Sequence, residues 1–198
     1  LNGITAIIEK DSTHMWIGTS TGLYLLEKAT GKYTYIQMPV ESYYIYSLCQ
    51  ASDGMLYIGT NNAGLLVYDT TKNTFRHYHR DNCALISNNI YTLLSDGKGN
   101  IFLSTEHGLS TFYPAEETFH NWTKEQGLKS DHFNAASGTL RKNGNFIFGS
   151  TDGAIEFDKD MVLPRDYKFK MVFSDLRVFY QTVYPKDEGS PLILDIDE

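Results

Sequence analysis

The sequence predicts an all-β fold made of about four four-stranded antiparallel β-propeller blades. A short phrase recurs four times along the 198 residues, as MWIGTSTGL, LYIGTNNAGL, IFLSTEHGL and FIFGSTDGA. Its small-residue pairs begin at residues 18, 59, 104 and 149, so the repeat steps are 41, 45 and 45 residues, the length of one blade. The composition agrees, because 14% of the residues are aromatic, 16 are glycine and only five are proline.

Each repeat divides into short strands when alternation and turn residues are followed. In the second repeat, residues 45–50 alternate and precede Asp53-Gly54, a tight-turn dipeptide, which predicts a hairpin with 56–60 and further strands at 65–69 and 74–79. The same pattern predicts strands at 4–8, 15–17, 23–26 and 33–36 in the first repeat, 90–94, 101–104, 109–113 and 118–122 in the third, and 135–140, 146–148 and 154–157 in the fourth.

The fourth repeat differs because no aromatic outer strand follows Asp158. We therefore expect blades at approximately 1–40, 41–84, 85–128 and 129–158. A different segment is expected over 159–198.

Two sets of recurring residues are expected to build the blades. Large apolar side chains recur in the second strand and should pack between neighbouring sheets. Glycines recur in the turn that follows and should supply positive φ angles. The first set is Trp16, Tyr57, Phe102 and Ile147, and the second is Gly22, Gly64, Gly108 and Gly153.

Charge and polar motifs exclude several classes of function. The net charge of −7 and the lack of a Lys/Arg cluster argue against nucleic acid as a partner, and no apolar run could span a bilayer. His77 and His79 have a zinc-compatible spacing but no third ligand nearby, so we predict no metal and no cofactor. Cys49 and Cys83 could form a pair or remain separate thiols.

The second repeat carries the most specific motif, ASDGMLYIGTNNAGLLVYD from Ala51 to Asp69. It resembles the two-component regulator propeller repeats in the sensor regions of bacterial hybrid two-component sensor histidine kinases. Trp16 holds the tryptophan position typical of that family, and the resemblance covers roughly residues 1–158. It implies a periplasmic module, the extracytoplasmic part of an inner-membrane protein.

The end of the chain resembles the start of the three-tyrosine immunoglobulin-like domain that follows the propeller in such sensors. The similar residues are FSDLRVF at 173–179 and Ser190-Pro191-Leu192. Only about 30 residues of a sandwich of roughly 100 are present, so 159–198 is expected to be a linker and a truncated domain start. We expect a fragment whose parent carries further blades, a membrane anchor, and kinase and response-regulator domains.

An arc of four blades leaves its terminal sheets without neighbours. It could close into a four-bladed ring, stay open, or pair with a second copy in an eight-bladed ring. We expect pairing, because association would cover the exposed apolar faces.

The strand order predicts where a ligand binds. Loops joining second to third strands, and fourth strands to the next blade, should share one face. Amides, carboxylates and tyrosines there suit hydrogen bonding and stacking to a sugar. The candidate ligand-binding residues are Tyr43, Tyr44, Asn61, Asn62, Glu106, His107, His132 and Asp152.

Function follows from the resemblance together with these residue types. We expect a sensing module that recognises an oligosaccharide or glycan and regulates transcription of carbohydrate-use genes. The alternative is a scaffold for protein contact or dimerisation, and a further one is a propeller hydrolase or lyase. No catalytic residue is predicted, because the side chains of adjacent pairs such as Glu106-His107 point to opposite faces of a strand.

Overall fold

The computed structural model of the protein describes residues 1–40, 44–157, 177–178 and 181–182. The chain divides into two compact units, Leu1–Met161 and Val162–Glu198. In the second unit, β16 (Arg177–Val178) and β17 (Gln181–Thr182) form an antiparallel pair. The rest of the predicted immunoglobulin-like start lies outside the described residues, and that domain assignment stays a prediction.

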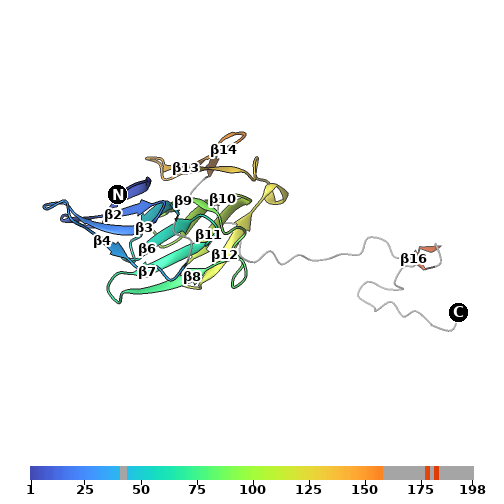
Figure 1. Cartoon of the computed structure of the whole chain (residues 1–198). Helices are drawn as coiled ribbons and strands as arrows, with labels where there is room; N and C mark the ends of the chain where they lie inside the picture. The colour runs from blue at the N-terminus through green and yellow to red at the C-terminus, as the bar shows by residue number, and fades with distance from the viewer. Residues whose placement is uncertain (41–43, 158–176, 179–180, 183–198) are drawn as a thin grey trace. The chain divides into compact units, whose positions relative to one another are not determined.

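The first unit confirms the predicted all-β propeller architecture, with successive antiparallel sheets that we call blades 1 to 4 (Figure 1). Blade 1 contains β1 (Ile4–Glu9), β2 (His14–Thr19), β3 (Gly22–Glu27) and β4 (Tyr33–Ile36), and blade 2 contains β5 (Ile45–Gln50), β6 (Leu56–Thr60), β7 (Leu65–Asp69) and β8 (Thr74–Tyr78). Blade 3 contains β9 (Ile90–Ser95), β10 (Ile101–Thr105), β11 (Gly108–Tyr113) and β12 (Thr118–Trp122). Blade 4 contains β13 (Phe133–Leu140), β14 (Phe146–Ser150) and β15 (Gly153–Phe157) as its described strands.

A short 3-10 helix, η1 (Lys124–Gln126), lies between blades 3 and 4. Its capping box joins Thr123 and Gln126, and Gly127 ends it with a left-handed φ of 95°. The helix therefore belongs to the connecting loop and adds nothing to the sheets.

The first strands of the blades pack on one another at the centre of the unit. Hydrogen bonds tie them together: Leu93 N–H donates to Ser47 Oγ at 3.0 Å, and Ser137 N–H donates to Thr92 Oγ1 at 3.1 Å. Each of these bonds joins one blade to the next. The first strands therefore position the loops that lead into them.

The recurring large side chains pack between blades, as predicted. The ring centroids of Trp16 and Tyr68 are 5.9 Å apart, those of Tyr57 and Phe112 are 6.3 Å apart, and Phe102 stacks on Phe146 at 4.3 Å. Each pair connects a second strand to the following blade. The fourth member of the set, Ile147, is partly buried.

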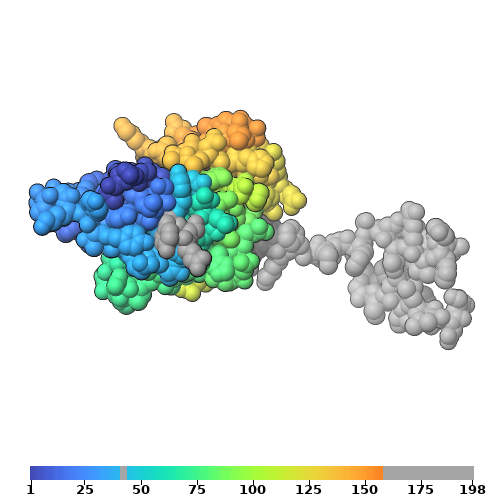
Figure 2. Space-filling model, viewed as in Figure 1, coloured from blue at the N-terminus to red at the C-terminus, as the bar shows by residue number. Residues whose placement is uncertain are grey.

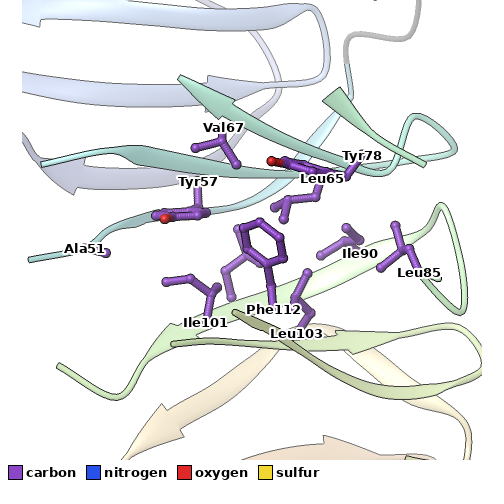
Figure 3. Packing of buried hydrophobic residues seen from close by; sticks show 11 residues of the cluster. Ala51, Tyr57, Leu65, Val67, Tyr78, Leu85, Ile90, Ile101, Leu103 and Phe112 are labelled. Carbon is purple, nitrogen blue, oxygen red and sulfur yellow. The ribbon is translucent and has the colours of Figure 1, made fainter. Parts of the chain in front are cut away.

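The core between blades 2 and 3 shows how these positions cooperate (Figure 3). Tyr57 and Val67 from blade 2 face Ile101 and Phe112 from blade 3, and each is 0 or 1% exposed. Burying a side chain of this size stabilises a fold by about 1.5–3 kcal/mol. The contact between sheets is thus a main source of stability.

The threonine or serine that ends each second strand holds the following turn. Thr60 Oγ1 donates to the Gly64 carbonyl at 2.7 Å and accepts the Ala63 N–H at 3.1 Å. Thr19, Thr105 and Ser150 make the equivalent pair of bonds in the other blades. The glycine in this turn has a positive φ in all four blades, as predicted: Gly22, Gly64, Gly108 and Gly153.

Candidate functional site

The turns after the second strands and the loops before the first strands meet on one face, which we call the loop face. In every blade the first N–H of the turn donates to the carbonyl just before the first strand. The four bonds are Ser20 to Gly3 (2.9 Å), Asn61 to Tyr44 (2.9 Å), Glu106 to Asn89 (3.3 Å) and Thr151 to His132 (3.0 Å). This arrangement agrees with the face predicted from strand order.

Polar and aromatic residues on this face form a tyrosine–glutamate cluster, which contains Tyr44, Tyr46, Asn89, Tyr91 and Glu106. The ring of Tyr46 lies 4.9 Å from that of Tyr44 and 5.3 Å from that of Tyr91. Asn89 Nδ2 donates to Glu106 Oε2 at 2.7 Å. The cluster joins blades 2 and 3.

Irregularities in the first strands bring the two central tyrosines together. The pairing of β5 with β6 shifts between Ile45 and Ser47, and Tyr46 is the residue left between them. The pairing of β9 with β10 shifts in the same way beside Tyr91. Because a bulge re-aims the extra side chain, both rings leave the regular alternation of their strands.

The surroundings of these tyrosines are partly desolvated and negatively charged. Desolvation raises the pKa of Tyr46, and the charges of Tyr44 and Glu106 raise it further. Desolvation also raises the pKa of Tyr91, with Glu106 and then Tyr46 adding to the effect. Both hydroxyls therefore stay protonated at neutral pH and can donate as well as accept hydrogen bonds.

An open groove of about 350 Å³ lies beside the cluster on the loop face. Residues of blade 2 and of the loop after it line this groove together with the short apolar segment before blade 2. The lining residues are Pro39, Val40, Asn62, Ala63, His77, His79, Asp81 and Asn88. Asn62 connects the groove to the cluster, because its N–H donates to Asn89 Oδ1 at 2.7 Å.

The structure brings some of the predicted site residues together. Tyr44 and Glu106 belong to the cluster, and Asn62 reaches it through Asn89. Asn61 contacts the Tyr44 backbone through its own N–H.

The remaining predicted site residues lie further out on the face. His107 is exposed, with Nε2 3.9 Å from Glu106 Oε2, and His132 Nδ1 lies 3.3 Å from the Glu106 carbonyl oxygen. Asp152 lies in the blade 4 turn, where its N–H donates to Ser150 Oγ. Tyr43 lies outside the described residues.

Sequence reasoning missed Tyr46, Asn89 and Tyr91. Tyr46 and Tyr91 occur one residue into strands that otherwise follow an apolar pattern, so they resemble ordinary alternation. A comparison of the repeats could have found them, because Tyr46 and Tyr91 occupy the same position, the second residue of the first strand, in repeats 45 residues apart. Asn89 gives no local signal, since its role depends on a turn from another strand.

The histidines and cysteines noted in the sequence can be placed in the structure. Among the described ranges, no group of three or more His, Cys, Asp and Glu side chains could hold a metal ion. The ring of His77 is engaged by the Ala63 carbonyl at 2.6 Å, and Glu106 Oε2 lies 3.9 Å from His107 Nε2. Both cysteines are free thiols, so the open question of their pairing is answered.

Comparison with known proteins supports the resemblance noted in the repeats. Residues 39–62 match the family model of the two-component regulator propeller. The match falls on blade 2, the repeat with the most complete motif, and confirms a regulator-propeller repeat in this chain.

A histidine kinase from Formosa agariphila, named Histidine kinase P4, is 21% identical over 192 residues. That alignment covers 92% of this chain and 14% of the kinase. The chain thus spans about a seventh of the length of this relative.

Two solved structures share the fold. The extracellular domain of a putative hybrid two component system from B. thetaiotaomicron has a TM-score of 0.63 at 20% identity, over 81% of this chain and 21% of that domain. Virginiamycin B lyase from Staphylococcus aureus has a TM-score of 0.61 at 15% identity, over 78% of this chain and 55% of the lyase. Within the described residues, no helix has the length and apolar character needed to cross a membrane.

Proposed function

We propose that this chain is part of the extracytoplasmic sensor region of a two-component system, located in the periplasm, and that its loop face binds an oligosaccharide. The regulator-propeller repeat and the similarity to a histidine kinase support the sensor assignment. In this proposal the fragment performs no catalysis. Ligand binding regulates transcription of carbohydrate-use genes through domains of a membrane-anchored parent.

The tyrosine–glutamate cluster is the observation that carries the ligand proposal. Tyr44, Tyr46 and Tyr91 form a continuous aromatic surface, and the C–H face of a sugar ring stacks on such surfaces. The carboxylate of Glu106 and the amides of the neighbouring turns accept and donate hydrogen bonds, which matches sugar hydroxyls.

Calorimetry on the purified chain, preceded by a glycan array, tests this proposal. Tyr46→Ala and Tyr91→Ala should each weaken binding of an array hit by about tenfold, which corresponds to a loss of ~1.4 kcal/mol of binding free energy. Tyr113→Ala is the matched control and should leave the affinity unchanged, because Tyr113 ends β11 at the side of the blade opposite to the loop face. Absence of binding to every glycan class would reject the oligosaccharide ligand.

A second candidate function, self-association, is favoured by the uncovered face of blade 1. Trp16 points toward blade 2, where its ring contacts Tyr68. Adjacent residues of a strand point to opposite sides, so Ile17 points away from blade 2 and marks this face. Ile7, Ile17, Tyr24 and Tyr35 lie opposite one another across the four strands. Ile17, near the middle of this row, is only 4% exposed, whereas Ile7 and Tyr35 are 51% and 39% exposed. Blade 1 forms one end of the row of blades (Figure 2).

A second copy of this chain fits the open face of blade 1. In blades 2 to 4 the equivalent face receives the large second-strand side chain of the preceding blade. Ile147 holds that position in blade 4 and points away from blade 3, because Phe146 beside it stacks on Phe102. We propose that blade 4 of one copy packs on blade 1 of another, so that two arcs close on each other.

Light scattering at micromolar concentration tests this pairing. The native chain should be a dimer, whereas Ile7→Glu should be a monomer because it places a charge in the contact. Leu140→Glu is a matched control, since Leu140 is 48% exposed but lies on the side of β13 shared with Phe146. A native chain that is monomeric at this concentration would contradict the proposed pairing.

A further inference from the structure

We infer that the tyrosine–glutamate cluster binds a neutral or amino-bearing sugar and rejects uronate and sulfated sugars, with Glu106 as the acceptor of the ligand and Asn89 as its positioning residue. The inference rests on the proposed function, because it concerns the chemical class of ligand at the same face. It follows from how the carboxylate is held and from the charges around it.

The aromatic part of the cluster sets where a sugar ring lies but not its charge. Tyr44 is 38% exposed, and Tyr46 and Tyr91 are partly buried, so the rings offer a surface that is accessible at one end. Stacking depends on the C–H face of the sugar and tolerates any substituent at the ring edge. Discrimination by charge must therefore come from the neighbouring polar groups.

Glu106 supplies this discrimination because part of its carboxylate is available to a ligand. Its side chain is 45% exposed, and Oε2 accepts the hydrogen bond from Asn89. Oε1 accepts no hydrogen bond from the part of the chain that the structure describes. An ionised carboxylate only accepts hydrogen bonds, so Oε1 can receive a hydroxyl or an ammonium group but repels a carboxylate or sulfate.

Asn89 fixes the carboxylate through bonds at each of its own polar groups. Its N–H donates to Ser87 Oγ at 3.1 Å, and its carbonyl accepts the Glu106 N–H at 3.3 Å. Its Oδ1 accepts the Asn62 N–H at 2.7 Å. Because Oδ1 must face that N–H, Nδ2 is the atom that faces Glu106, and the amide orientation is determined by the network.

The local charge is negative because of Glu106, and the neighbouring imidazole of His107, with Nε2 3.9 Å from Glu106 Oε2, carries a positive charge only when it is protonated. The charged groups that act on the pKa values of Tyr46 and Tyr91 are Glu106 and the neighbouring tyrosines, and no Lys or Arg from the described ranges is among them. Arg and Lys side chains are common partners of bound carboxylate and sulfate groups. The chain as a whole also carries a net charge of −7.

A glycan array that includes neutral, amino, uronate and sulfated oligosaccharides is the first test, with the purified 198-residue chain as the probe. Hits should be confined to the neutral and amino classes. Calorimetry with three β-1,4-linked gluco-configured hexamers then isolates charge: cellohexaose, the glucosamine hexamer and the glucuronate hexamer. The glucuronate hexamer should bind at least about tenfold more weakly than cellohexaose, a difference of ~1.4 kcal/mol.

Variants test whether Glu106 and Asn89 act at the ligand itself or whether the net negative charge of the protein explains the preference. Glu106→Gln should reduce the preference for the glucosamine hexamer over cellohexaose by about tenfold and should relax the rejection of glucuronate. Glu125→Gln removes the same charge from an exposed residue in the loop before blade 4, and it should change neither ratio. Asn89→Ala should weaken cellohexaose binding, and its effect should nearly vanish in the Glu106→Gln background if Asn89 acts through the carboxylate.

The outcomes distinguish this inference from the proposed function. Array hits among uronate or sulfated glycans that are lost in Tyr91→Ala would overturn the charge inference while leaving the oligosaccharide site intact. An unchanged glucosamine preference in Glu106→Gln, with a native melting curve, would also overturn it. No hits in any class would overturn both proposals.

Discussion

The face of blade 3 that packs on blade 2 and the open face of blade 1 occupy the same positions of the repeat but have different surroundings. In blade 3, Leu103 and Phe112 are fully buried against Tyr57 and its neighbours. In blade 1, Ile17 at the position of Leu103 is also buried. Leu26, at the position of Phe112, pairs across the strands with Tyr33, which is 54% exposed. The repeat encodes an apolar face in both cases, and the presence of a neighbouring blade decides whether it contributes to stability.

Truncation of one large residue on each face gives the largest expected difference. Phe112→Ala should lower the free energy of unfolding by about 3–5 kcal/mol, because it leaves a cavity among Tyr57, Tyr78 and Phe119. In the monomeric Ile7→Glu background, Tyr35→Ala on the open face should cost less than about 1 kcal/mol. Urea denaturation of both variants in that background measures this, and equal losses would mean that the blade 1 face is covered within a single chain.

Loss of a turn threonine should have a smaller effect. Thr60→Val keeps the shape of a buried side chain but removes the bonds to Gly64 and Ala63, so we expect a loss of about 1–3 kcal/mol. Thr74→Val, at an exposed position of β8, should stay within about 0.5 kcal/mol. If the two variants unfold at the same urea concentration, the turn bonds do not stabilise the blade.

Ser104 offers a change in the opposite direction. Ser104 is fully buried, and its Oγ has no hydrogen-bond partner among the described residues. Ser104→Ala removes this unsatisfied hydroxyl and should stabilise the protein by about 1 kcal/mol, which raises the melting temperature by about 2–4 °C. A lower melting temperature would show that the hydroxyl has a partner.

The smallest expected effect is a pH dependence from Cys49, which packs against the core between blades 2 and 3. Burial raises the pKa of this thiol from 9.0 to about 11. The thiol ionises at a lower pH in the unfolded chain than in the folded protein. Its contribution to stability is therefore complete below pH 9 and is lost as the pH rises to 11. Stability of the native protein should therefore fall more steeply over this range than that of Cys49→Ala. Parallel curves for the two proteins would contradict the burial of this thiol.

The sequence was most informative where a local pattern repeats. Strands 33–36, 45–50, 56–60, 65–69 and 118–122 have the bounds that alternation and turn residues predict. The other strands of the four blades differ by one or two residues at one or both ends. Turn glycines were equally readable, since a tight turn between two strands needs positive φ whatever surrounds it. These features depend on neighbours in sequence.

The candidate site was only partly readable for the opposite reason. The loop face followed from strand order, and Glu106 and Tyr44 were recognised as polar and aromatic loop residues. Asn89 and Tyr91 escaped notice because their partners lie elsewhere in the chain, Glu106 in the turn after β10 and Tyr46 in β5. An irregularity in each first strand also redirects the two tyrosines. No local pattern reports such a convergence.

The sequence by itself therefore determined the four repeated sheets, their strand order and the turns that hold them, because spacing, alternation and glycine conformation are local properties of the chain. The tertiary structure decided which tyrosines meet beside Glu106 and which apolar faces stay uncovered. Both depend on contacts between blades about 45 residues apart, where packing geometry and not local preference sets the outcome.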